Sequence, residues 1–153
     1  MSIFHSINTS ASALTAQRLR MDVISSNMAN VDTTRGKIVN GEWQPYSRKT
    51  VVMEPREGSF SSFLQMAKGG RVNSAVGNGV KVSAIKEDNK TPFKMVFDPE
   101  HPDANADGFV QMPNVDPLRE MVDLMSATRS YEANVTVMNA SKSMLMKALE
   151  IGK

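Results

Sequence analysis

The most ligand-like stretch of the sequence runs from residue 98 to 108 and is rich in oxygen-bearing side chains. At alternate positions it carries Asp103, Asn105 and Asp107, followed by Gly108. This order matches the first half of an EF-hand calcium loop, which spaces its oxygen ligands every second residue and turns at a glycine. The twelfth position is Asn114 where a bidentate Glu is required, and Pro99 and Pro102 break the preceding helix. We therefore expect a surface turn, with calcium binding by the Asp98–Asp107 loop as an open alternative.

Residues for nucleophilic or metal-based catalysis are scarce. The sequence has no cysteine, which excludes disulfides, thiolate metal sites and cysteine nucleophiles. Its two histidines, His5 and His101, lie far apart in the sequence and in no catalytic or zinc motif. The turn at Gly77 and Gly79 has Val82 where a phosphate-binding loop would carry its third glycine. We expect no enzyme activity, no cofactor and no metal site.

Charge and hydropathy exclude further classes of partner. Eighteen basic and sixteen acidic residues are interspersed, so the net charge is only +2, too weak and dispersed for nucleic-acid binding. No apolar run approaches the roughly 18 residues of a transmembrane helix, and residues 1–20 lack the pattern of a secretory signal. We expect no membrane insertion, no small-molecule substrate and no cleaved signal peptide.

The two ends of the chain are predicted to be long helices. In residues 2–30 and 117–151, apolar residues recur every seven positions, the narrow stripe of a coiled-coil seam. The rows are Ile7, Leu14, Met21 and Met28 in the first helix; Leu124, Tyr131, Met138 and Leu145 in the second; and Met121, Thr128, Val135, Lys142 and Leu149 beside them. Asp116 is a natural N-cap before Pro117 at the first helical position, with Glu120 in the first turn. Polar interruptions at Ser10, Gln17 and Lys142 keep a compact helical bundle as the alternative.

The middle of the chain reads as short strands and turns. Strands are predicted at residues 46–53, 80–85, 93–97 and 109–112, with a short helical patch around Phe60 to Met66. The fold class is therefore α+β, with long terminal helices paired as an antiparallel coiled coil and a small β-rich central domain. The expected divisions are 1–32, 33–113 and 114–153.

The junction after the first helix carries a recognisable string from Ser25 to Thr34. Its asparagines, Asn27 and Asn30, are suited to capping the last helical carbonyls or to a left-handed backbone. The string resembles the S-x-N-x-A-N-x-x-T signature of the flagellar rod and hook family of axial proteins. That signature falls here on Ser25, Asn27, Ala29, Asn30 and Thr33. Residues 107–116 and 120–134 are similar to the C-terminal region of rod proteins in the same family, and residues 45–49 fit as well.

This resemblance implies a structural subunit of the bacterial basal-body rod, the tubular drive shaft that carries torque to the hook and encloses the export channel. Implied partners are copies of the chain, other rod proteins, the basal-body ring or export gate and the distal rod. Implied too are export without a cleaved signal and a position spanning the periplasm. We expect the assembly interface at Ile7, Leu14, Met21, Met28, Met121, Leu124, Tyr131, Val135, Met138 and Leu145. A soluble coiled-coil adaptor or chaperone is the competing hypothesis.

Overall fold

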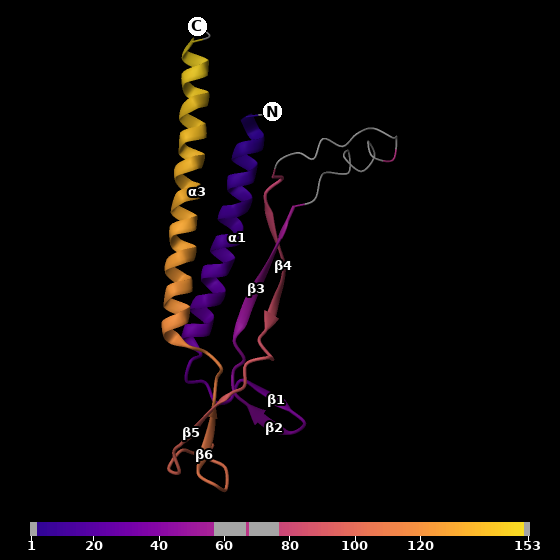
Figure 1. The fold of residues 1–153 in the computed structure, drawn as a ribbon, viewed down its shortest axis with the longest axis vertical. Helices are drawn as coiled ribbons and strands as arrows, with labels where there is room; N and C mark the ends of the chain where they lie inside the picture. Colours follow the sequence, from indigo (N-terminus) through magenta and orange to yellow (C-terminus); the bar gives the residue numbers. More distant parts are fainter. Residues whose placement is uncertain (1–2, 57–66, 68–76, 152–153) are drawn as a thin grey trace. The chain divides into compact units, whose positions relative to one another are not determined.

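The computed structural model describes residues 3–56, 67 and 77–151 of the chain. Two long helices and six short strands occupy these residues (Figure 1). The elements are α1 (Ile3–Ala29), β1 (Lys37–Val39), β2 (Glu42–Gln44), β3 (Lys49–Pro55), β4 (Val80–Glu87), β5 (Lys94–Phe97), β6 (Phe109–Met112) and α3 (Pro117–Ile151). The α+β class is confirmed, while the helical patch expected near Phe60 to Met66 lies outside the described residues.

Local hydrogen bonds mark the end of α1 and the start of α3. The 27 residues of α1 contain no glycine or proline, and the Asn30 amide donates to the carbonyl of Ser26 at 2.8 Å to close the last turn. The 35-residue α3 starts at Pro117, and the Asp116 carboxylate accepts a hydrogen bond from the Leu118 N–H at 3.1 Å. The predicted N-cap at Asp116 is thus confirmed.

The six strands form three separate two-stranded sheets: β1 with β2, β3 with β4, and β5 with β6. The β1–β2 and β5–β6 pairs are antiparallel. In the first pair Ile38 faces Trp43 across a tight turn at Asn40 and Gly41, whose φ angles are 54° and 91°. Two consecutive positive φ angles make this a turn suited to Asn-Gly. The other four strands were predicted from the sequence, and this hairpin was not.

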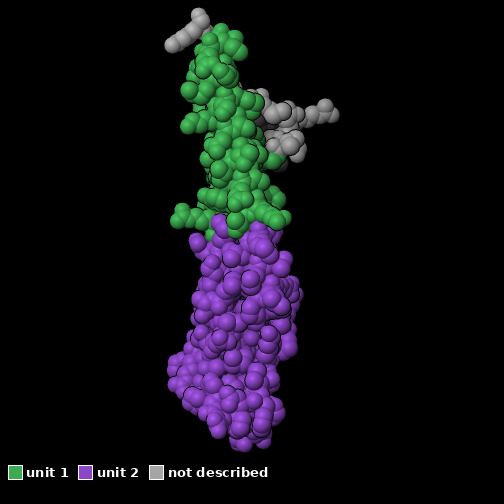
Figure 2. Space-filling view, turned by 90° about the vertical axis from the view of Figure 1, so that its left-hand side faces the viewer, with its two compact units in different colours: residues 1–18, 52–84, 128–153 green, residues 19–51, 85–127 purple. Residues whose placement is uncertain are grey.

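The chain divides into two compact units, and each takes part of both helices. The first unit contains residues 1–18, 52–84 and 128–153; the second contains 19–51 and 85–127 (Figure 2). Nearly half of the buried side chains of the described residues are polar. The apolar ones are Ala16, Val23, Ile24, Pro45, Val110, Pro113, Val115 and Ala127, and the polar ones are Ser10, Asn27, Ser47, Asn114, Glu120 and Ser141. A core this small and this polar contributes little hydrophobic stabilisation by itself.

Of the two apolar rows expected along α3, one is half-buried throughout and the other is mostly exposed. Leu124, Tyr131, Met138 and Leu145 are half-buried. Of the row expected beside them, only Val135 is half-buried, whereas Met121 is 49% and Leu149 70% exposed. The less exposed row begins one residue earlier and consists of Glu120, Ala127, Asn134 and Ser141. Because these residues are small or polar, the apolar pattern of the sequence did not indicate their row.

Candidate functional site: a buried polar junction

Asn27 is the centre of the most polar part of the second unit. It lies near the end of α1, and only 1% of it is exposed. Its amide nitrogen donates to the carbonyl of Lys49 at 2.8 Å and to Oε2 of Glu120 at 3.0 Å. Its amide oxygen accepts from the N–H of Lys49 at 2.9 Å and the hydroxyl of Tyr46 at 3.0 Å. All four hydrogen-bonding positions of the side chain are therefore filled.

Glu120 is the second fixed point of this junction. It is fully buried in the first turn of α3, and its Oε1 accepts a hydrogen bond from Nε of Arg48 at 2.5 Å. The other end of the Arg48 guanidinium donates to Asp123 at 3.2 Å, and Asp123 also accepts from Arg20 of α1 at 3.2 Å. The charges alternate from α1 through Asp123 to Arg48 and Glu120, so the buried carboxylate has the partner it needs.

A polar side chain from the loop before α3 completes the junction. The Asn114 oxygen accepts from the N–H of Arg48 at 2.7 Å, and its amide donates to the carbonyls of Asp88 and Thr91 at 2.8 and 3.0 Å. Asp88 in turn closes its own turn, because its carboxylate accepts from the hydroxyl of Thr91 and from the N–H groups of Lys90 and Thr91. These hydrogen bonds, led by that of the Thr91 hydroxyl, hold the pKa of Asp88 below its ordinary value.

The five residues of the Ser25–Thr33 motif differ in their burial and hydrogen bonds. Asn30 caps α1 as expected, and its oxygen accepts from the Thr33 hydroxyl at 3.2 Å. Asn27 instead lies inside the helix and does not cap it. Neither asparagine adopts a left-handed backbone, since Asn40 is the sole non-glycine residue with positive φ in the described part of the chain. Ser25 and Ala29 are exposed.

The β5–β6 turn contains the loop that resembled a calcium site. Asp103 accepts hydrogen bonds from the Thr34 hydroxyl at 2.7 Å and from the Arg35 guanidinium at 2.8 and 2.5 Å. The side-chain hydrogen bond from Arg35 is the main reason that the pKa of Asp103 is lowered. The Asn105 oxygen accepts from the Phe109 N–H at 2.8 Å. These oxygens fasten the turn, and the described residues contain no cluster of three or more His, Cys, Asp or Glu suited to a metal ion.

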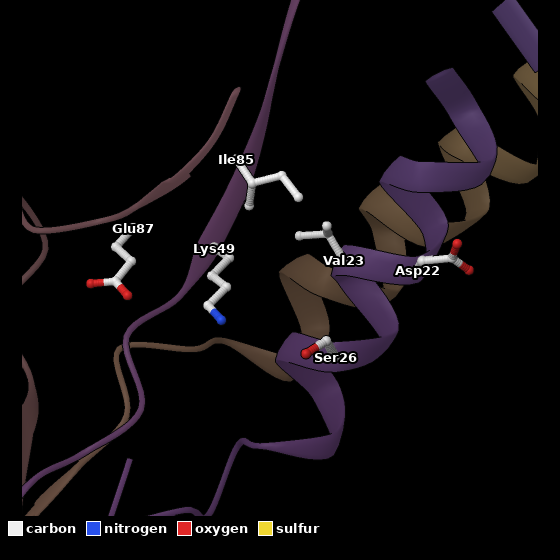
Figure 3. A pocket seen from close by; sticks show the side chains of 6 residues that line it. All are labelled: Asp22, Val23, Ser26, Lys49, Ile85 and Glu87. Atoms are coloured by element: carbon white, nitrogen blue, oxygen red, sulfur yellow. The ribbon is translucent and has the colours of Figure 1, made fainter. Parts of the chain in front are cut away.

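A shallow hollow borders the junction on the side of the β3–β4 strands. Its volume is about 500 Å³, and it is lined by Asp22, Val23, Ser26, Lys49, Ile85 and Glu87 (Figure 3). Glu87 accepts a hydrogen bond from Lys37 at 2.7 Å, which lowers the pKa of Glu87. Val23 and Ile85 form the apolar part of this hollow.

The expected assembly residues share a half-buried setting, with one exception. Ile7, Leu14, Met21, Met28, Leu124, Tyr131, Val135, Met138 and Leu145 are half-buried, and Met121 is exposed. Other large apolar side chains of α3 are exposed as well: Leu118, Val122, Met125, Val137, Met144, Met146, Leu149 and Ile151. No described helix has the length and apolar character needed to cross a membrane.

Comparison with known proteins identifies the family of this chain. A family model described as the flagella basal body rod protein matches residues 7–36, and one described as the flagellar basal body rod FlgEFG protein C-terminal matches residues 106–151. The chain is 67% identical to the flagellar basal-body rod protein FlgC of Bacillus subtilis over the whole length of both. The chain belongs to the FlgC family. It is 43% identical to FlgC of Borreliella burgdorferi and 41% identical to FlgC of Escherichia coli O157:H7, in each case over at least 98% of both chains.

Members of the FlgC family are structural components of the flagellar basal-body rod and not enzymes. The buried junction joins the two segments that the family models match, because Asn27 belongs to the first and Asn114 and Glu120 to the second. Arg48, between the two segments, contacts both Asn114 and Glu120. The motif predicted a role for Asn27, whereas the position of Glu120 in the first helical turn indicated only an interaction with the helix dipole. The available signal was spacing: Glu120, Leu124, Ala127 and Tyr131 follow the 4-3-4 pattern of a coiled-coil seam.

Proposed function

We propose that this chain is a subunit of the flagellar rod that polymerises through its terminal helices. In this proposal residues 1–32 and 114–153 form the helical core of a tube, and residues 33–113 pack outside it. The tube transmits torque from the motor to the hook and encloses the export channel. Its partners are copies of the chain, other rod proteins, the basal-body ring or export gate and the distal rod.

The observation that carries the proposal is the unequal burial along α3. This 35-residue helix is about 50 Å long at 1.5 Å per residue, yet many of its large apolar side chains are exposed in the single chain. Isolated helices are marginal in water, and most of their stability comes from burying an apolar face. Neighbouring subunits would supply the missing burial, so assembly and the ordering of the helix ends would be coupled.

The proposal also accounts for the route and the place of assembly. The helix ends stay only partly ordered in the free chain, which suits export through the flagellar type III apparatus without a cleaved signal. They become ordered when the chain joins the rod in the periplasm. The two helices then pair as an antiparallel coiled coil, and the antiparallel contacts of Asn27 with Glu120 and of Arg20 with Asp123 support that direction.

A matched pair of substitutions tests the proposal in cells. Met138→Asp introduces a charge at a half-buried position of α3, and Asn139→Asp introduces the same charge at the next, exposed residue. We expect Met138→Asp, alone or with Leu14→Asp in α1, to abolish rod assembly and swimming, because it buries an unpaired carboxylate. Asn139→Asp should swim like the parent. Full motility of both Met138→Asp and Leu14→Asp, or absence of the chain from purified basal bodies, would contradict the proposal.

A further inference from the structure

The apolar rows of the two helices do not define a unique pairing. On α1 they recur as Ile7, Leu14, Met21 and Met28, and on α3 as Leu124, Tyr131, Met138 and Leu145. A slip of seven residues moves one helix by about 10 Å along its axis and replaces each row member with the next. Hydrophobic burial therefore distinguishes poorly between the observed register and its slipped alternatives.

The polar junction has no such repeat. Asn27 meets Glu120 at 3.0 Å, and one heptad further along α3 the residue that would take the place of Glu120 is Ala127. A slipped pairing would separate the fully buried Glu120 from Arg48 and Asn27 together. Removing a buried charge from its partner is strongly unfavourable, although the intact pair adds little net stability over apolar residues. The junction therefore discriminates between registers without depending on its own net strength.

The junction also includes groups from a segment that lies between the two helices in the sequence. Arg48 and Lys49 follow the β1–β2 hairpin, and the N–H and the carbonyl of Lys49 are both hydrogen-bonded to the side chain of Asn27. Arg48 then reaches Glu120 of α3 through its side chain and Asn114 through its backbone N–H. The hydrogen bonds of Arg48 with α3 are complete only when the loop before α3 also brings the Asn114 oxygen to the backbone N–H of Arg48.

We propose that the Asn27–Arg48–Glu120 junction is a register lock, which selects one antiparallel pairing of the two terminal helices within each chain. The inference rests on the proposed function in one respect: a polymer supplies the competing helices of neighbouring copies. A single buried polar group is known to fix register and partner in coiled coils in the same way. The lock lies wholly within the second unit, so the helix ends of the first unit need not be ordered for it to form.

Distance measurements on spin-labelled full-length protein test the lock. The chain has no cysteine, so Asp32→Cys with Met125→Cys places two labels at exposed positions of the second unit, outside the junction. The test variant is Arg48→Met with Glu120→Leu, which removes both charges together and leaves neither unpaired. The matched control is Lys37→Met with Glu87→Leu, which removes an exposed ion pair of 2.7 Å in the same unit.

We expect a single narrow distance in the parent and in the Lys37/Glu87 control. In the Arg48/Glu120 variant we expect a second population, from helices slipped by about 10 Å along the axis, with helix content by circular dichroism unchanged. Glu120→Gln keeps the side-chain length and removes the charge, so it should give a smaller second population and remains informative if the double variant unfolds.

The lock is overturned if Glu120→Gln and every folded Arg48/Glu120 variant keep the single parental distance, or if the parent itself shows several distances. These outcomes are independent of the proposed function, because the labelled protein is measured free in solution. Absence of the chain from basal bodies would refute the rod proposal and leave the lock intact.

Discussion

Replacing Asn27 with alanine should destabilise the chain far more than the same change at Asn30, although both belong to the same motif. Asn27→Ala removes four hydrogen bonds from a side chain that is 1% exposed. Asn30→Ala removes one bond to the Ser26 carbonyl and one from Thr33, both at a partly buried position that water can reach. The comparison therefore isolates the cost of burial.

The magnitude follows from the groups left behind by Asn27→Ala. The N–H and carbonyl of Lys49 both lose their partner, and an unsatisfied buried polar group costs about 1–3 kcal/mol. Glu120 keeps Arg48, and Tyr46 is half-buried, so these two add little. Alanine is the better helix former by roughly 0.5 kcal/mol, which offsets a small part. The net loss should be about 3 kcal/mol, against about 1 kcal/mol for Asn30→Ala.

Urea or thermal unfolding followed by circular dichroism measures this difference. For a chain of this size 1 kcal/mol shifts the melting temperature by about 2–4 °C, so Asn27→Ala should melt about 6–12 °C lower. Asn8→Ala changes an exposed asparagine in the same helix and should leave the melting temperature nearly unchanged. Equal destabilisation by Asn27→Ala and Asn30→Ala would refute the reasoning, since the four hydrogen bonds of Asn27 would then contribute no more to the free energy of unfolding than a helix cap.

Two further predictions concern a turn and a loop. Gly79→Ala should lower the free energy of unfolding by about 1–3 kcal/mol, because its φ is +92° and a Cβ there would clash with the Ser12 hydroxyl oxygen. Gly41→Ala, with φ +91° and open space around it, controls for backbone strain alone, and equal effects in urea unfolding would exclude a role for the Ser12 contact. The second prediction is a pH dependence. Asp103 has a lowered pKa, chiefly through the hydrogen bond from Arg35, so it contributes stability above its ordinary value of 3.8 that is lost as the pH falls through the lower folded pKa. Asp103→Asn should therefore flatten the decline in the unfolding midpoint below about pH 4, and an unchanged slope would contradict the assignment.

Helices and most strands could be predicted from the sequence because their signals are local. Asp116 and Pro117 mark the start of α3 by capping chemistry that needs no tertiary contact, and the structure begins the helix there. The β1–β2 hairpin was predictable in the same way, since Asn40 and Gly41 form the dipeptide that such turns prefer. That miss reflects an overlooked local signal and not a limit of the sequence.

The polar junction could not be predicted in the same way, because its partners lie far apart in the chain. Arg48 and Glu120 are 72 residues apart, and Asn27 and Glu120 are 93 residues apart. Charged residues are rarely buried without a partner, so Glu120 in a first helical turn is normally assigned to solvent and to the helix dipole. Only the fold reveals that Arg48 meets it. The spacing of Glu120 within a seam pattern was a hint, but it could not identify the partner.

The division between polar and apolar burial suggests how stability and specificity are separated in this chain. At the junction the buried side chains of Asn27, Asn114 and Glu120 all have hydrogen-bond partners within the chain, so a neighbouring subunit is not needed to satisfy them. Apolar side chains of α3, including Leu149 at 70% and Ile151 at 85% exposure, have no comparable burial in the single chain. Hydrophobic contact is non-directional and adapts to different neighbours, whereas a buried ion pair tolerates one geometry. A rod subunit built in this way would fix its own fold at the junction and leave the free energy of helix burial to be gained on assembly.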